Sequence, residues 1–463
     1  MSVSPQLRKI CLLLLTGWLT ATFLVWASAY GQTPDRSRLH YDRGVSFFRQ
    51  LDFDAAIEEL RQAIEINPSY AEARNALGAA LVGKGDIAGS IQQFEEALRL
   101  RSGYAEAHYN LGVALTIKGD LDEAVRQFLT CLQLDPKNAR AHYNLGMTLG
   151  RQGNIQGAVA AFQSALELMP ADAEARYGLA LAWQDQGRFH ESIEQIRQVL
   201  AREPNFVEAR YHLAVALQKQ RQTPDAMREI RLVLGLRHHY PEAHDLLGRM
   251  LKEADDLPGA IAELRTAVEQ DPAFAEARFD LASALRQQGD LKGALNQFHE
   301  AVKLNPSYRQ AYLGLGGTLR KLGETEEGQD AFREAERLQR ISSNSKLANG
   351  ANDLACSLWS QGKVEEAVAE FRRALELNPT LAESHYNLGI LLGHKGLLAE
   401  AKTEFLRAIQ LRPGFARAYY NLGVVQERLG ESAEARQAFE KAYHLDPSLP
   451  RFSFLPAPSS GQA

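Results

Sequence analysis

Residues 108–112 read His-Tyr-Asn-Leu-Gly (HYNLG), and the same five residues recur at 142–146 and 385–389, with YYNLG at 419–423. The first two copies start 34 residues apart, and so do the last two. The second and third copies start 243 residues apart, which is seven periods of 34 with five residues left over. A fixed period of this length indicates a chain built from stacked structural repeats.

The repeat has a clear internal pattern when Gly112 is placed at position 8 of a 34-residue frame. In all twelve units position 8 is Gly or Ala, position 20 is Ala, Ser or Gly, and position 24 is Phe, Leu or Ile. Positions 7, 8 and 11 share one helical stripe, and positions 20, 24, 27 and 28 share another. Small residues at 8 and 20 allow close approach, so each unit is predicted to be two packed helices.

Turn residues separate these helices. Gly119, at position 15, suits the left-handed conformation that ends a helix, and Asp120 then suits the N-cap of the next one. Position 32 is Pro in nine of the twelve units, which ends the second helix. With its Leu-Gly, Ala-x-x-x-Phe and Pro in this order, the chain resembles the tetratricopeptide repeat family. The resemblance covers about 37–449 and implies an all-α, right-handed α-solenoid of about twelve helix-turn-helix repeats.

The family pattern is not matched everywhere. Position 4, where the family has Trp, is His, Arg, Tyr or Ala in this chain, and position 11 is mostly Leu instead of Tyr. We expect these differences to change packing detail and to leave the fold unchanged.

The N-terminal segment is typical of a secretory signal. A basic pair, Arg8 and Lys9, precedes an apolar run over 10–26, and small residues follow, with candidate cleavage after Ala29 or Gly31. Two alternatives remain open, a cleaved signal peptide over 1–31 or an uncleaved membrane anchor. Both predict an exported protein that is periplasmic or secreted, or anchored to the membrane by residues 10–26.

The repeat frame sets the other boundaries. The expected segments are a linker over 32–36, repeats one to nine over 37–342, a register break over 343–347, repeats ten to twelve over 348–449, and a tail over 450–463 expected to be disordered. Position 32 of repeat nine is Arg340, so no Pro ends that helix. The break is interpreted either as a helix longer by about a turn or as a hinge between the two blocks of repeats.

Composition and motifs exclude several kinds of function. The chain has 52 Lys and Arg against 57 Asp and Glu, so it lacks the excess of basic residues that is typical of nucleic-acid-binding proteins. Residues 78–85 begin like a phosphate loop, but Gly85 replaces the required Ser or Thr. The position-4 histidines belong to separate repeats and do not converge on one ion, while Cys131 and Cys356 lie too many repeats apart for a disulfide. We therefore expect no catalytic residue, no cofactor and no metal.

The side of the first helix that points away from the packed stripe is the candidate binding surface. In tetratricopeptide proteins this side lines the inside of the superhelix and holds a peptide. Position 6 carries four asparagines: Asn110, Asn144, Asn387 and Asn421. They look like the inner asparagine ladder of O-linked N-acetylglucosamine transferases, whose amides hold a peptide backbone. Because the ladder is interrupted between the two pairs, two short grips are expected, unless asparagine is merely tolerated at an exposed position.

Two further positions border this surface. Position 5 carries six tyrosines: Tyr109, Tyr143, Tyr177, Tyr211, Tyr386 and Tyr420. Their rings are expected either to pack against the next repeat or to offer a hydroxyl edge to a ligand. Position 2 is often Glu, which favours a basic partner or is simply stabilised by the helix dipole.

The sequence favours an exported, non-enzymatic scaffold. It is predicted to bind peptide segments of partner proteins on the concave face, in the assembly or organisation of envelope complexes. The alternatives are a self-assembling structural protein and a non-catalytic subunit that presents substrates to a separate enzyme. The sequence fixes neither the partner nor the oligomeric state.

Overall fold

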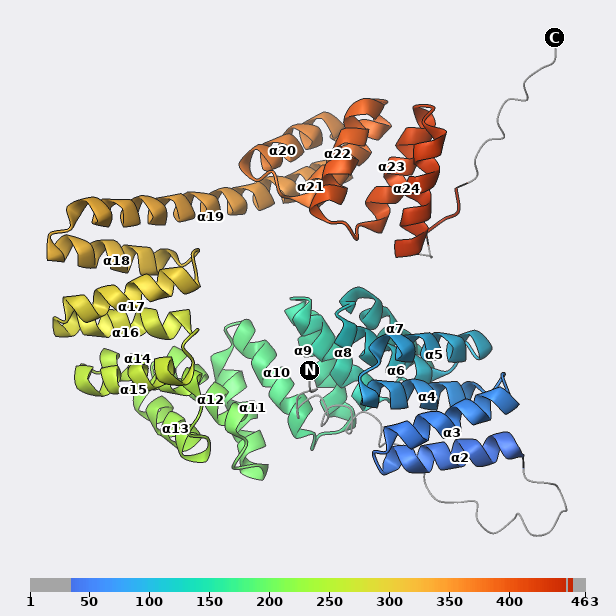
Figure 1. The fold of residues 1–463 in the computed structure, drawn as a ribbon, viewed down its shortest axis with the longest axis horizontal. Coiled ribbons are helices and arrows are strands. Elements are labelled where there is room, and N and C mark those ends of the chain that lie inside the picture. Colours follow the sequence, from blue (N-terminus) through green and yellow to red (C-terminus); the bar gives the residue numbers. More distant parts are fainter. Residues whose placement is uncertain (1–34, 447–448, 453–463) are drawn as a thin grey trace. The chain divides into compact units, whose positions relative to one another are not determined.

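The computed structural model describes residues 35–446 and 449–452, which fold as 23 α-helices joined by short turns, without a strand (Figure 1). The predicted signal or anchor over 1–31 and most of the tail lie outside the described residues. No helix in the described part has both the length and the hydropathy needed to cross a membrane. The predicted all-α architecture of helix pairs is confirmed.

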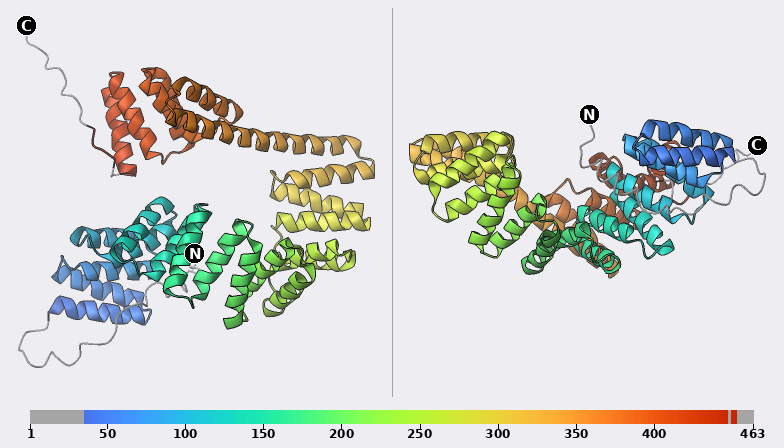
Figure 2. Two further views of the ribbon diagram at one scale, coloured as in Figure 1. Left: turned by 180° about the vertical axis from the view of Figure 1, so that it is seen from behind. Right: turned by 90° about the horizontal axis from the view of Figure 1, so that it is seen from below.

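The chain divides into two compact units, of which the first ends at Asp271. Its helices form seven consecutive pairs: α2 (Arg36–Arg49) with α3 (Phe53–Ile66), α4 (Ala71–Lys84) with α5 (Ile87–Leu100), α6 (Ala105–Lys118) with α7 (Leu121–Leu134), α8 (Ala139–Arg151) with α9 (Ile155–Leu168), α10 (Ala173–Asp185) with α11 (Phe189–Arg202), α12 (Val207–Lys219) with α13 (Thr223–Leu236), and α14 (Pro241–Glu253) with α15 (Leu257–Gln270). Figure 2 shows from two further directions that neighbouring helices of the unit run side by side.

The second unit begins at Pro272. Its helices are α16 (Ala275–Gln288), α17 (Leu291–Leu304), α18 (Arg309–Leu322), α19 (Thr325–Ser360), α20 (Val364–Leu377), α21 (Ala382–His394), α22 (Leu398–Leu411), α23 (Ala416–Arg428) and α24 (Ser432–Leu445). Except at α19, they form helix pairs as in the first unit.

Each helix pair is held together by a small residue that faces a large one. A Cβ built on Gly112 of α6 would lie 2.8 Å from Cε1 of Phe128 in α7, which leaves no room for a side chain. Phe128 is fully buried, and so are the rings at position 24 of five other repeats. Full burial of one such ring stabilises the fold by about 1.5–3 kcal/mol. The glycine therefore sets the distance between the helices, and the ring fills the space beside it.

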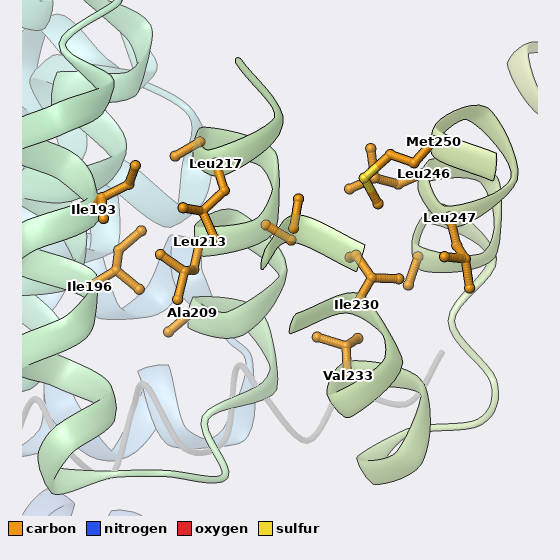
Figure 3. Close-up of a cluster of buried hydrophobic side chains, with 14 of the residues drawn as sticks. Ile193, Ile196, Ala209, Leu213, Leu217, Ile230, Val233, Leu246, Leu247 and Met250 are labelled. Atoms are coloured by element: carbon orange, nitrogen blue, oxygen red, sulfur yellow. The ribbon is translucent and has the colours of Figure 1, made fainter. Parts of the chain in front are cut away.

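The same stripe continues from one repeat to the next. Figure 3 shows Ile193 and Ile196 of α11 facing Leu213 and Leu217 of α12. In the same cluster Ile230 of α13 belongs with the side chains of α14. The second helix of one repeat is therefore covered by the first helix of the next, and the hydrophobic core runs along the array.

The predicted caps shape the turns. Gly85 and Gly119 end α4 and α6 with φ values of 90° and 93°, in the left-handed region that glycine adopts without strain. Asp86 then caps α5, since its side chain accepts a hydrogen bond of 2.9 Å from the backbone N–H of Gly89. Asp120 is also an N-cap residue, but its side chain makes no capping hydrogen bond.

Position 4 has a larger role than the packing detail expected from the sequence. Nδ1 of His108 lies 2.6 Å from Oε1 of Gln127 on the second helix, and its Nε2 lies 2.9 Å from the carbonyl oxygen of Ser102 in the preceding turn. His244 makes the same two contacts, with Glu263 and with the carbonyl of His238. Arginines take this role in four other repeats: Arg74, Arg176, Arg210 and Arg278. One polar side chain thus ties together both helices of a repeat and the turn before it.

Repeats nine and ten share a single helix. α19 has 36 residues and runs without interruption through 343–347, so the helix continues much further than the expected one turn, and a hinge at this place stays a prediction. Arg340 stands where Pro ends the second helix in nine repeats, which allows the helix to continue. Figure 1 shows α18 beside the first part of α19 and α20 beside its last part.

We predict that Phe128→Ala lowers the free energy of unfolding by about 3–5 kcal/mol, because it leaves a cavity where a fully buried ring stood. Leu129→Ala is the matched control, since Leu129 is the next residue and is 46% exposed, and we expect a change within about 0.5 kcal/mol. Urea denaturation followed by circular dichroism measures both, and hydrogen exchange locates the loss in α6 and α7. Equal effects of the two substitutions would contradict this account of the core.

We also predict a pH dependence at His244. The hydrogen bond to Glu263 raises the pKa of His244 above its ordinary value. The stabilisation is therefore fully present below the unfolded pKa of about 6.5 and is lost as the pH rises through the raised pKa of the folded state.

Glu263→Gln reproduces the His108–Gln127 arrangement without the carboxylate, so this variant should lose up to about 1 kcal/mol of stability at low pH and little at high pH. Thermal unfolding of parent and variant across the pH range gives the difference. A difference that does not change with pH would show that the charge of His244 contributes nothing.

Candidate functional site

The candidate binding surface is defined here as the first-helix face: positions 2, 5, 6 and 9 of the first helices. Its parts in the two units are described separately. All ten predicted site residues lie on first helices, namely α6, α8, α10, α12, α21 and α23. Tyr109 and Asn110 are buried at 5% exposure, whereas the other eight side chains are half-buried.

The Tyr and Asn of HYNLG bind each other between successive repeats. Asn144 donates a hydrogen bond of 3.0 Å from Nδ2 to the hydroxyl of Tyr109, which lies 35 residues earlier. In the second unit Asn421 donates the same bond, at 3.1 Å, to Tyr386. Position 6 of one repeat is therefore tied to position 5 of the repeat before it. Such a bond contributes about 0.5–1.5 kcal/mol, so these asparagines stabilise the stacking of repeats.

Asn110 makes a related tie in a buried setting. Its Nδ2 donates to Oδ1 of Asn75, at 3.0 Å, and Asn75 in turn donates to Glu106 and to the hydroxyl of Tyr104. Burial raises the pKa of Glu106, and the hydrogen bond from Asn75 opposes this shift. Asn110 therefore supports this network and is too buried to contact a peptide directly.

The position-6 asparagines differ in how many of their side-chain hydrogen-bonding groups remain available to a ligand. Nδ2 of Asn144 also donates to the carbonyl of Arg140, so both of its N–H groups have partners and its carbonyl oxygen remains. Asn387 has only a long contact of 3.8 Å from Nδ2 to Sγ of Cys356. Asn387 and Asn421, both half-buried, consequently have more hydrogen-bonding capacity to offer than Asn110 or Asn144.

The tyrosine rings pack in the array while most keep an exposed edge. The ring of Tyr143 packs against Phe162, with centroids 5.9 Å apart. The ring of Tyr386 packs against Phe405 in the same way, at 6.0 Å. Tyr211 stacks on Tyr240 at 5.2 Å. Burial raises the pKa of the Tyr143 and Tyr177 hydroxyls, so they stay protonated at physiological pH. These hydroxyls act as neutral hydrogen-bonding groups and not as acids or bases.

Three ion pairs with arginines reduce the acidic character of the glutamates at position 2. Glu72 pairs with Arg101 at 2.7 Å, and Arg101 also lies over the ring of Tyr104. The pairs Glu208–Arg237 and Glu383–Arg412 repeat this arrangement. Part of the acidic row expected from the sequence is therefore paired, which weakens the case for a basic partner.

A shallow cavity of about 370 Å³ lies in the second unit between repeats ten and eleven. Its polar lining includes Asn349 and Asn352 of α19, Ser384 of α21, and the Glu383–Arg412 pair. Oδ1 of Asn352 accepts a hydrogen bond of 2.8 Å from Ser384. This volume falls within the range of ligand sites, and the lining contains both hydrogen-bond donors and acceptors.

Catalytic or metal chemistry has no visible basis in the described residues. They contain no group of three or more His, Cys, Asp or Glu that could hold a metal ion. Cys131 is buried and Cys356 exposed, and neither forms a disulfide. Burial raises the pKa of Cys131 to about 12 and also raises that of Cys356. Both thiols are therefore protonated and poorly nucleophilic.

Sequence reasoning missed two parts of this surface. Asn75 stands at position 5, where most repeats have an aromatic residue, and it partners Asn110. The sequence also predicted only a packing role for position 4, whose side chains in fact form hydrogen bonds. Both could have been found from polar residues that recur at a fixed separation in the sequence. This separation is 35 residues for the Asn–Tyr hydrogen bond and 19 residues for the position-4 contacts.

Family models match the chain along most of its length. Models described as TPR repeat match residues 114–153 and 357–396. Models described as tetratricopeptide repeat match residues 41–105, 246–298, 279–344, 386–450, 184–250 and 139–172. No curated protein matches the chain.

Solved structures resemble parts of the chain. A tetratricopeptide repeat protein from Parabacteroides merdae is 18% identical, over 54% of this chain and 99% of its own, with a TM-score of 0.43. Pseudomonas aeruginosa pilF is 20% identical, over 45% and 95%, with a TM-score of 0.41. MamA from Desulfovibrio magneticus RS-1 is 23% identical, over 36% and 95%, with a TM-score of 0.35.

A double-mutant cycle tests the Asn–Tyr tie. We predict that Tyr109→Phe and Asn144→Ala are coupled by about 0.5–1.5 kcal/mol in the free energy of unfolding, because each removes the same hydrogen bond. Tyr143→Phe with Asn144→Ala is the control, since position 6 of the repeat after Tyr143 is Gly178 and offers no amide. Additive effects in the first cycle would show that the 3.0 Å contact contributes nothing.

Proposed function

Because the chain belongs to the tetratricopeptide repeat family, we propose that it is an exported, non-catalytic scaffold that binds peptide segments of partner proteins. The proposed binding surface is the first-helix face, and the proposed process is the assembly or organisation of envelope complexes. Export rests on the sequence of residues 1–31, with the mature protein periplasmic, secreted or held at the membrane by residues 10–26.

The observation that supports peptide binding is the set of amides in the second unit. Asn387 and Asn421 are half-buried with hydrogen-bonding capacity left over, and they stand on α21 and α23 in successive repeats. Packed first helices lie roughly 10 Å apart, which matches about three residues of an extended peptide. The polar cavity bordered by Asn352 and Glu383 adjoins this region. Together these groups suit recognition of a peptide backbone.

The roles of the four asparagines then differ. Asn387 and Asn421 are the proposed direct contacts, and Asn144 contributes its carbonyl oxygen. Asn110, which is 5% exposed, acts by holding Asn75 and Glu106 in place. The half-buried tyrosines Tyr143, Tyr177, Tyr211, Tyr386 and Tyr420 supply ring edges along the same face. A subunit that presents substrates to an enzyme would use this face in the same way, and a catalytic partner would then co-purify.

The test replaces the four asparagines Asn110, Asn144, Asn387 and Asn421 by Ala and compares crosslinked partners from an envelope extract with those of the parent. A second variant changes only Asn387 and Asn421, and the control is Asn205→Ala, an exposed turn residue outside the face. A peptide from the identified partner should bind both variants at least about tenfold more weakly, the loss expected for two hydrogen bonds.

Helix content of the variant with two substitutions should equal that of the parent, and its melting temperature should fall only slightly, because Asn421 also donates a hydrogen bond to Tyr386. If the parent captures no specific partner, or if the two asparagine variants keep the partners and affinities of the parent and of Asn205→Ala, the first-helix face is not the binding surface. Fractionation of cells expressing the full-length chain tests export separately, and a protein found wholly inside the cytoplasm would contradict that part of the proposal.

A further inference from the structure

The fusion of two repeats in α19 leaves one helix face without its usual cover. Ten leucines at position 7 of other first helices are only 2–6% exposed: Leu77, Leu111, Leu145, Leu179, Leu213, Leu247, Leu281, Leu315, Leu388 and Leu422. Leu354, at the same position in repeat ten, is 47% exposed. The cause is that the second helix of repeat nine continues into repeat ten and does not fold back over it.

This face keeps the residues of a packed interface. Position 7 of α2, which begins the array, is Arg43, an exposed charged residue of the kind expected at an open end. Repeat ten has Leu354 at that position. Leu347, seven residues earlier on the same helix α19, is 55% exposed. Gly350, at position 3, is exposed as well, whereas Ala209 at position 3 of α12 is fully buried. An end of the array that stayed in water would not need this apolar pattern.

Four exposed residues and the half-buried Ser343 form one stripe along α19, which we call the α19 seam: Ser343, Leu347, Gly350, Leu354 and Ser357. They follow each other at intervals of four and three residues, the spacing of a coiled-coil seam. At 100° per residue, Ala348, Ala351 and Ala355 lie on another side of the helix, and they are buried beside α20. The seam therefore faces neither α20 nor the cavity bordered by Asn349 and Asn352.

We propose that the α19 seam binds the α19 seam of a second copy of this chain, in an antiparallel arrangement with two-fold symmetry. Large and small residues alternate along the seam, so an antiparallel copy is complementary to it. When Leu347 of one copy lies opposite Gly350 of the other, Leu354 falls opposite Ser343. Every leucine then meets a small residue, and the symmetry repeats each contact.

Charge supports the same arrangement. Lys346 and Asp353 are exposed and lie on one flank of the seam, seven residues apart. In an antiparallel pair of helices, flanking residues of one helix meet the corresponding flanking residues of the other. The alignment that places leucine opposite a small residue brings Lys346 of each copy to Asp353 of the other. In a parallel arrangement this flank would instead face the opposite flank of the other helix, where Asn344 and Ala351 carry no charge. Of the residues in this contact, Asp353 stands at position 6 of repeat ten and so also belongs to the first-helix face.

The test measures the mass of the full-length chain by sedimentation and light scattering across concentration, in one buffer and detergent. A two-heptad seam supports a reversible dimer, so the parent should rise from the chain mass of 51.4 kDa toward twice that value. Leu347→Glu and Leu354→Glu should abolish the rise. Ile341→Glu is the matched control, because Ile341 lies on the opposite side of α19 and is 50% exposed, and it should dimerise like the parent.

Charge reversal gives the sharper result. Lys346→Glu and Asp353→Lys alone should each weaken the dimer by about tenfold, since each replaces two attractive contacts by repulsive ones. The double reversal should restore it. A parent that stays monomeric up to the millimolar range would overturn the proposal, and so would a dimer that persists in the leucine variants or a double reversal no better than the single ones. Circular dichroism must show unchanged helix content in every variant.

Discussion

The close approach of two helices at positions 8 and 20 is the constraint on which the whole array depends. A glycine such as Gly112 brings the backbones together, and a ring such as Phe128 fills the space beside the contact. Once this distance is fixed in every pair, the next first helix can lie over the second helix and continue the stripe of buried residues. Position 4 then secures the geometry, because one histidine or arginine holds both helices and the preceding turn. The proposed binding surface consists of first-helix positions that lie outside this packed stripe.

The period of 34 residues was sufficient to predict the fold, because the same packing demands recur in phase in twelve units. The candidate site was harder. The sequence placed Asn144 and Tyr109 on one face, but it could not show that they bind each other, since they are 35 residues apart in the chain. The course of α19 was also missed. Arg340 in place of Pro removes a stop signal, but this absence does not say how far a helix continues or what the next repeat then packs against.

The first-helix face combines two demands on the same amides. An asparagine that ties two repeats together loses part of its capacity to bind a peptide, as Asn144 shows with both N–H groups engaged. Asn387 makes only a long contact to Cys356, because repeat ten has Asn352 instead of tyrosine at position 5, and so Asn387 remains more available. The exchange of one position-5 partner is therefore enough to turn a structural amide into a candidate recognition group. Variation of this kind changes specificity without a change in fold.

The continuous helix α19 has a consequence for how the chain folds. In an array of repeats each pair contacts only its neighbours, so folding can begin in several places and spread by packing. Between repeats nine and ten the spread occurs by helix propagation, since 36 residues form one hydrogen-bonded segment about 54 Å long. Helix growth takes nanoseconds per residue, far faster than the docking of side chains. The loss of a single turn near Ser343 would uncouple the two blocks, which makes α19 both the fastest link in the array and the easiest to interrupt.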